Sequence, residues 1–126
     1  MQTAELLKLE PAGLYCAAGD FFIDPLRPVA RALITHAHAD HARPGHAQVL
    51  ATAETLAIMA IRYGESFAGA TQAVSYGETL NLGGVDVSFH PAGHVLGSAQ
   101  ILLAGVSSRT VVSGDYKRER DPTCET

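Results

Sequence analysis

The sequence predicts a strand-rich α/β fold with a single convincing helix. Short apolar runs recur along the 126-residue chain, separated by turns that contain glycine or proline, as expected of a protein built from short strands. One segment shows the period of a helix, and one apolar run alternates with polar residues as a half-buried strand does. With 47% apolar residues and a net charge of −4, the composition is that of a globular domain.

The first elements are expected to be a hairpin and then a buried strand. Strands at 14–17 and 21–24 flank the segment Ala18-Gly19-Asp20, which has the composition of a hairpin turn. Two prolines then interrupt the chain, and Arg31–Thr35 forms an apolar run typical of a buried strand. A further short strand is predicted at 48–51.

The periodicity supports a helix that runs from Thr52 to Tyr63. Thr52 is a suitable N-cap, and Gly64 is a suitable residue for the C-terminal end. One face of this helix is apolar at helical spacing, and we expect it to pack in the core: Leu56, Met59, Ala60 and Tyr63.

After the helix, the pattern returns to strands separated by turns with glycine. We expect strands at 73–76, 79–80, 85–89, 100–103 and 110–112. Val85, Val87 and Phe89 alternate with polar neighbours, which predicts one buried face. No repeat, linker or low-complexity segment occurs, so residues 1–126 are expected to form one domain at most.

Charge and cysteine content exclude several classes of protein. Lys and Arg never occur more than two in a row, so the charge pattern alone does not indicate nucleic-acid binding. Cys16 and Cys124 fit no zinc-knuckle or CxxC spacing and are expected to be reduced thiols. The first ten residues carry three charges, which excludes the apolar core of a signal peptide. No apolar run reaches the ~20 residues of a membrane span. We therefore expect a cytoplasmic protein without a membrane partner.

The segment from His36 to His41 places three imidazoles and one carboxylate directly after the predicted strand at 31–35. Imidazole nitrogens and carboxylate oxygens are the ligands of catalytic zinc. All four groups cannot reach one ion without strain, so we assign His36 and His38 to one metal and Asp40 and His41 to a second. Metal pairs of this kind serve many phosphoesterases. The alternative is a histidine-rich surface loop that binds nothing.

Two more candidate ligands follow predicted strands further along the chain. His94 lies between Gly93 and Gly97 after one strand, and Asp115 follows another. Each signal is weak alone. Because a sheet edge holds separate loops at fixed spacing, the three segments together predict a metal site assembled from several loops.

These motifs resemble those of the metallo-β-lactamase superfamily in their order, each at the end of a strand: Asp24, His36, His38, Asp40, His41, His94 and Asp115. The forms of segments 91–99 and 113–116 are similar to those of the β-CASP nucleases, a group within that superfamily. Segments 18–25, 115–118 and 121–125 are further similar to bacterial ligase-associated DNA exonucleases, also described as mRNA 3′-end processing factor-like. The resemblance implies the αββα sandwich of the superfamily, of which residues 1–126 would be the N-terminal part.

The resemblance also implies a ligand set. His36, His38 and His94 would bind the first zinc, Asp40 and His41 the second, and Asp115 would bridge the two ions. Asp40 and His41 would be the catalytic residues.

Further residues are interpreted from the resemblance or from their position. Asp24 would orient the ligand loop through hydrogen bonds, and the alternative is an ordinary Asp-Pro turn. Lys117 and Arg118 are candidate phosphate contacts, as is the nearby Arg120, with solvated surface charge as the alternative. His46 and His90 match no ligand position, and we interpret them as an ordinary loop histidine and a strand-end histidine.

A complete two-zinc site of this family takes one more histidine from a later strand, and His90 and His94 are the last histidines in this sequence. The β-CASP insertion and the C-terminal part of the fold are also missing. We therefore expect the N-terminal portion of a longer nuclease, weak or inactive by itself.

The implied function is a zinc-dependent phosphodiester hydrolase: a DNA exonuclease that acts at DNA ends through a metal-bridging hydroxide. Two Zn²⁺ ions, or Mn²⁺ in their place, would be the cofactors. DNA rather than RNA would be the partner, together with an ATP-dependent DNA ligase. Three alternatives stay open: an RNA-processing β-CASP nuclease, a small-molecule hydrolase of thioesters or lactams, and a catalytically incomplete metal-binding or partner-binding module.

Overall fold

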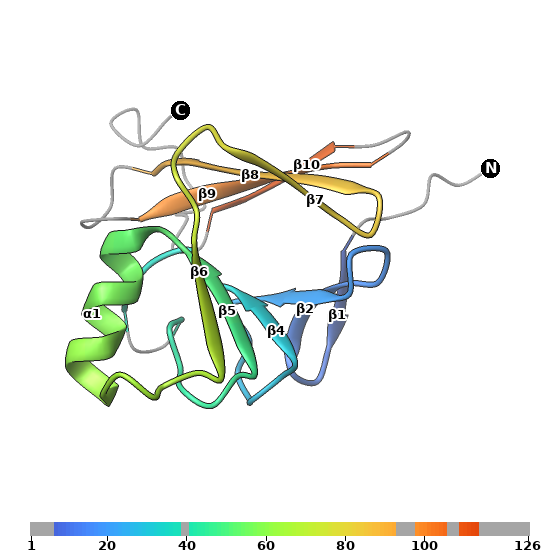
Figure 1. The fold of residues 1–126 in the computed structure, drawn as a ribbon. Helices are drawn as coiled ribbons and strands as arrows, with labels where there is room; N and C mark the ends of the chain where they lie inside the picture. The colour runs from blue at the N-terminus through green and yellow to red at the C-terminus, as the bar shows by residue number, and fades with distance from the viewer. Residues whose placement is uncertain (1–6, 39–40, 93–97, 106–108, 114–126) are drawn as a thin grey trace, which may run out of the picture.

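The computed structural model describes residues 7–38, 41–92, 98–105 and 109–113, and it contains two β-sheets and a helix (Figure 1). The elements in chain order are β1 (Lys8–Glu10), β2 (Gly13–Cys16), β3 (Phe21–Ile23), β4 (Arg31–Leu33), β5 (Gln48–Ala51), α1 (Ala53–Tyr63), β6 (Ala70–Ala73), β7 (Thr79–Leu82), β8 (Val85–Pro91), β9 (Ala99–Ala104) and β10 (Arg109–Ser113). The predicted strand-rich α/β class is confirmed.

The two sheets differ in how their strands run. The first has six strands in the order β1-β2-β3-β4-β5-β6, antiparallel from β1 to β3 and parallel from β3 to β6. The second has four antiparallel strands in the order β10-β9-β8-β7. Figure 1 shows the second sheet lying across one face of the first, with α1 beside the parallel strands.

Two cores hold three layers together. The core between the sheets contains buried side chains from both: Phe21, Ile23, Leu33, Leu50, Val85, Val87, Phe89, Ile101 and Leu103. The core on the other face of the first sheet joins it to the helix: Ala32, Ile34, Val49, Ala51 and Met59. Because successive side chains of a strand point to opposite faces, Leu33 faces the second sheet while Ala32 and Ile34 face α1. The order of layers is therefore helix, mixed sheet, antiparallel sheet.

The helix forms where the periodicity predicts it. Thr52 is the N-cap, and its side-chain oxygen accepts a hydrogen bond from the Thr55 amide at 3.3 Å. Gly64 ends the helix with φ at 93°, and its amide donates to the Ala60 carbonyl at 2.8 Å. Met59 is fully buried, and the rest of the predicted stripe packs against the same core: Leu56, Ala60 and Tyr63.

Most strand predictions are confirmed, but the strand predicted at 73–76 is wrong in position. β6 lies at Ala70–Ala73, where it pairs in parallel with β5. Val74 then turns into the core, and Tyr76 makes only an isolated bridge with Phe89. All four residues of β6 are exposed. They form a strand because they pair with β5, and not because of an apolar pattern. The exposed β1 carries no strand pattern either, and the sequence does not predict it.

Two turns pack tightly where the sheets meet. Gly83, in the β7–β8 turn, has φ at 63°, and a Cβ there would lie 2.1 Å from the Ala18 carbonyl oxygen in the β2–β3 turn. Only glycine permits so close an approach of two main chains. Between the sheets, Cys16 is a buried free thiol, as predicted; Cys124 lies outside the described residues.

Parallel pairing sets up the edge at which the predicted ligands gather. Ile23 of β3 is opposite Leu33 of β4, so the chain leaves both strands at the same edge of the sheet. Asp24 follows the first strand and His36 follows the second, which explains how residues far apart in the chain converge. Within the described ranges there is no helix with the length and apolarity needed to cross a membrane.

Candidate metal centre

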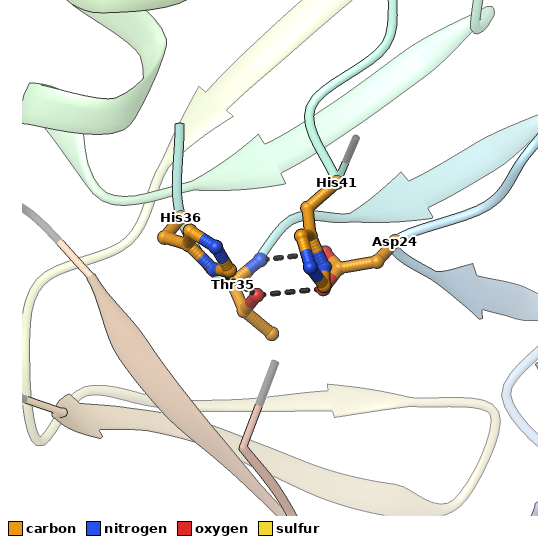
Figure 2. A network of polar contacts seen from close by, with 4 residues as sticks. All are labelled: Asp24, Thr35, His36 and His41. Carbon is orange, nitrogen blue, oxygen red and sulfur yellow. Dashed lines mark hydrogen bonds and ion pairs between the residues drawn. The ribbon is translucent and has the colours of Figure 1, made fainter. Parts of the chain in front are cut away.

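Three histidines of the predicted cluster, His36, His38 and His41, lie on the loop that follows β4, called the ligand loop below. Figure 2 shows Asp24, at the end of β3, beside Thr35, His36 and His41. His36 is buried with 1% exposure, His41 is partly buried, and His38 is exposed. The rings of His36 and His41 are 4.3 Å apart, and those of His36 and His38 are 4.9 Å apart, between centroids. A freely exposed loop, the alternative weighed above, does not describe His36.

The Asp24 carboxylate clamps the start of this loop. The Thr35 amide donates to Asp24 Oδ1 at 2.8 Å, and the Thr35 hydroxyl donates to Oδ2 at 2.6 Å. Asp24 has a positive φ of 48°, a left-handed conformation that aspartate tolerates better than most residues. The pair therefore fixes the backbone immediately before His36.

The same carboxylate sets the proton positions on two imidazoles. His41 Nδ1 lies 2.9 Å from Asp24 Oδ2, so it donates its proton to the carboxylate. The Thr35 hydroxyl gives its only proton to Asp24 and so accepts one from His36 Nδ1, at 2.9 Å. These contacts favour the tautomer with the proton on Nδ1 in both rings. This is how a carboxylate prepares a histidine to bind metal.

The donor set fits a divalent metal. One ligand atom each from Asp24, His36 and His41 lies within 4.8 Å of the others. Imidazole nitrogen with carboxylate oxygen suits zinc and its first-row neighbours better than magnesium or calcium. Asp24 already accepts hydrogen bonds from Thr35 and His41, which leaves the two imidazoles as the stronger candidates for direct ligation.

Backbone contacts hold the loop beyond His36. Arg62 of α1 donates from its guanidinium to the Ala37 carbonyl. The His38 carbonyl accepts from the amides of His41 at 2.9 Å and Ala42 at 2.8 Å, which closes a tight turn. The loop is therefore anchored both at the sheet and at the helix.

The second sheet approaches the same loop from the start of β9. The Ala99 amide donates to the Thr35 carbonyl at 2.7 Å. The Ser98 carbonyl accepts from the Tyr76 hydroxyl at 2.7 Å and from the Ala92 amide at 3.3 Å. These bonds bring Ala92 and Ser98 together and place the start of β9 beside the ligand loop.

Several predicted site residues lie outside the described residues: Asp40, His94, Asp115, Lys117, Arg118 and Arg120. The predicted site residues that the structure does bring together are Asp24, His36, His38 and His41. Thr35 and Arg62 were not predicted. The position of Thr35 directly before the first histidine is a weak sequence signal for a role in the site. The position of Arg62 on a helix gives no such signal.

His46 differs from its interpretation as an ordinary loop histidine. It is buried with 1% exposure, and its Nδ1 accepts from the Val29 amide at 3.1 Å. Burial lowers its pKa below the usual value. His90 lies near the end of β8, with Nε2 2.8 Å from the Ser88 hydroxyl.

Comparison with known proteins identifies relatives by sequence and by fold. No protein-family profile matches the chain. A probable DNA ligase of Opitutus terrae is 34% identical over 115 residues, which are 90% of this chain and 11% of that protein. Ribonuclease TTHA0252 of Thermus thermophilus is 34% identical over 126 residues, covering 80% of this chain and 29% of that protein. The chain thus spans less than a third of either relative.

Among solved structures, a B3 metallo-β-lactamase with an active-site glutamic acid superposes with a TM-score of 0.53 at 20% identity. The match covers 94% of this chain and 61% of that one. At this identity the likeness concerns the fold, and it confirms the predicted architecture. By sequence the chain is similar to part of a probable DNA ligase and part of a ribonuclease, and by fold it is similar to a metallo-β-lactamase. These likenesses agree with the resemblance of its motifs to the metallo-β-lactamase superfamily and its β-CASP nucleases.

Proposed function

We propose that this chain carries the metal-binding part of a nuclease that hydrolyses phosphodiester bonds. The observation that carries the proposal is the Asp24–Thr35 network, which engages Nδ1 of both His36 and His41 in the manner of the groups that orient metal-binding histidines. The alignment with a ribonuclease over 80% of the chain supports nucleic acid as substrate.

In this proposal His36, His38 and His94 hold one metal, Asp40 and His41 hold the second, and Asp115 bridges them. The ring distances among the described histidines support shared ligation by His36 and His38. When bound, divalent ions supply charge neutralisation at the phosphate and a water of lowered pKa. Asp24 orients the imidazoles and keeps their Nδ1 atoms protonated.

We further propose zinc as the metal and DNA as the substrate, attacked from its ends, in the cytoplasm. The relative named a probable DNA ligase aligns with 90% of the chain, which supports DNA as the substrate and a DNA ligase as the partner. RNA cleavage is the second candidate, favoured by the ribonuclease relative. The lactamase structure shares only the fold and favours neither.

The test compares cleavage of end-labelled DNA and RNA of one sequence by the 126-residue chain and by the full-length gene product. Zn²⁺ or Mn²⁺ is added or withheld. We expect metal-dependent shortening of DNA from its ends, weak for the chain alone, and little cleavage of circular DNA. Asp40→Ala and His41→Ala should abolish it.

Each other outcome decides between alternatives. Cleavage of RNA alone would replace the DNA assignment with RNA processing. Metal binding without cleavage of either polymer by the full-length protein would favour a binding module. Hydrolysis of a lactam or thioester at higher efficiency than DNA would overturn the nuclease proposal.

A further inference from the structure

We infer that Arg62, in the last turn of α1, is a positioning residue of the metal centre that holds the peptide between His36 and His38. The inference rests on the proposed function, in which these two histidines share one metal. Arg62 lies 25 residues further along the chain than Ala37, and its guanidinium donates to the Ala37 carbonyl. Through this bond the helix layer reaches into the ligand loop.

The geometry holds the guanidinium in place on two sides. Its central carbon lies 5.7 Å from the centroid of the Tyr63 ring, a cation–π contact, and Tyr63 packs against the core beneath the helix. Ala37 is 4% exposed, so the loop backbone at this point is enclosed. The bond therefore joins two parts of the molecule that packing already holds.

The position of the bond determines what it controls. The Asp24–Thr35 network acts on the loop before His36 and on the side chains of His36 and His41. The Ala37 carbonyl belongs to the peptide that continues into His38, so Arg62 acts on the next ligand along the loop. This peptide sets the backbone position from which the His38 side chain extends toward the neighbouring His36 ring.

Arginine has properties that suit this role. Its guanidinium carries its charge throughout the physiological pH range, so the donor is always present. Hydrogen bonds from a charged donor are stronger than neutral ones. Arg62 also lies where a positive charge favours the helix dipole, so its effect on the helix must be separated from its effect on the loop.

The experiment measures Co²⁺ and Zn²⁺ affinity of the 126-residue chain by competition with a chromophoric chelator. Arg62→Met removes the donor and the charge, whereas Arg62→Lys keeps the charge for the helix and offers a donor. Arg27→Met is the matched control, because Arg27 is an exposed arginine outside the helix. We expect affinity to fall by about 10-fold in Arg62→Met, at the lower end of the range for groups that support ligands. Arg62→Lys should recover part of this loss, and Arg27→Met should match wild type.

Two readouts separate positioning from general stability. The visible spectrum of the Co²⁺ form should shift in Arg62→Met, because a displaced His38 changes the ligand geometry. In the metal-free protein, the His38 amide should exchange with solvent faster in Arg62→Met than in Arg27→Met.

Wild-type affinity and an unchanged Co²⁺ spectrum in Arg62→Met would overturn the inference. The proposed function would then stand if His36→Ala still lost metal. If wild type binds no metal at all, the proposed function fails, and the exchange of the His38 amide alone decides whether Arg62 holds the loop. If Arg62→Met does not fold, the same comparison is made with Arg62→Lys. A loss of metal affinity below about 2-fold in Arg62→Lys would then count against the inference.

Discussion

At the scale of single residues, Asp24 acts on two imidazoles by different routes. It accepts the Nδ1 proton of His41 directly and orients His36 through the Thr35 hydroxyl. The carboxylate is mostly buried, with 10% exposure of its side chain, so these bonds form in a place where water competes poorly. Under the proposed ligand assignment, one mostly buried carboxylate therefore orients histidines that bind two different metals.

Asp24→Asn should weaken metal binding by roughly 10–100-fold without unfolding the chain, the range found for groups that orient ligands. The asparagine side chain is neutral, and its NH₂ group cannot accept a hydrogen bond from His41 or Thr35. Zinc titration against a chelator measures the effect, and circular dichroism checks the fold. An unchanged titration would favour the interpretation of Asp24 as a turn residue.

Thr35→Val should disturb His36 more than Thr35→Ser does. Valine keeps the shape but removes the hydroxyl that links Asp24 to His36, whereas serine keeps it. We expect the ¹⁵N signals of His36 in the metal-free protein to show a mixture of tautomers in Thr35→Val and the Nδ1–H form in wild type and Thr35→Ser. The same His36 tautomer in all three proteins would contradict the proposed link from Asp24 through the Thr35 hydroxyl to His36.

His46 should make stability depend on pH below neutrality. Its pKa is lowered by burial, and Nδ1 must stay unprotonated to accept from the Val29 amide. The unfolded chain, with a histidine pKa of about 6.5, therefore binds the proton more readily. Its contribution to stability is complete above pH ~6.5 and is lost as the pH falls below that value toward the folded-state pKa.

Urea unfolding from pH 8 to 5 measures this slope. His46→Gln should reduce the loss of unfolding free energy on acidification, while His90→Gln, at a half-buried position of β8, serves as the control. Equal slopes for wild type and His46→Gln would assign the acid sensitivity to other groups.

At the scale of elements, the β7–β8 turn closely approaches the β2–β3 turn. Gly83 and Gly84 both have positive φ, at 63° and 94°, so alanine is strained at either. Only at Gly83 would the added carbon meet another main chain, 2.1 Å from the Ala18 oxygen, since nothing lies within 4 Å at Gly84. The pair therefore separates backbone strain from collision.

Gly83→Ala should lower the free energy of unfolding by about 1–3 kcal/mol more than Gly84→Ala, the usual cost of overpacking. The neighbours are backbone atoms, which cannot rotate out of the way. Chemical denaturation of both variants gives the difference. Equal losses would mean that the two turns move apart at little cost.

The helix and several strands follow from local sequence, whereas pairing decides the rest. Thr52 and Gly64 bound the helix as predicted, because caps and helical spacing involve residues a few positions apart. β5 occupies the predicted 48–51. β6 begins three residues earlier than predicted, because its pairing with β5 determines which exposed residues form the strand.

At the scale of the whole molecule, the ligand loop connects all three layers. Asp24 ties it to the first sheet, Arg62 to the helix, and the Ala99 amide to the second sheet. A metal bound there should stabilise the whole fold rather than the loop alone. Any ligand that binds only the folded state raises stability in this way.

Zinc at about 100 times its Kd should add ~2.7 kcal/mol to the free energy of unfolding and raise Tm, with chelator reversing the shift. The double variant His36→Ala with His38→Ala should lose the shift, because two ligands of one metal are gone. The shift should shrink as pH falls through ~6.5, because imidazole must be neutral to bind metal. Scanning calorimetry measures it, and an equal shift in the double variant would contradict the ligand assignment.

By itself, the sequence determined the strand-rich α/β class, the capped helix and the place of the histidine cluster at a strand end. These features depend on residue periodicity and on neighbours in the chain, which are visible without a structure. The resemblance implied that Asp24 orients the ligand loop, but only the tertiary structure showed that its partners are Thr35 and His41. The tertiary structure alone also decided that His46 is buried. It likewise decided that Arg62 meets Ala37. Such contacts depend on the register of parallel strands and on the packing of a helix across a sheet, and no local pattern encodes either one.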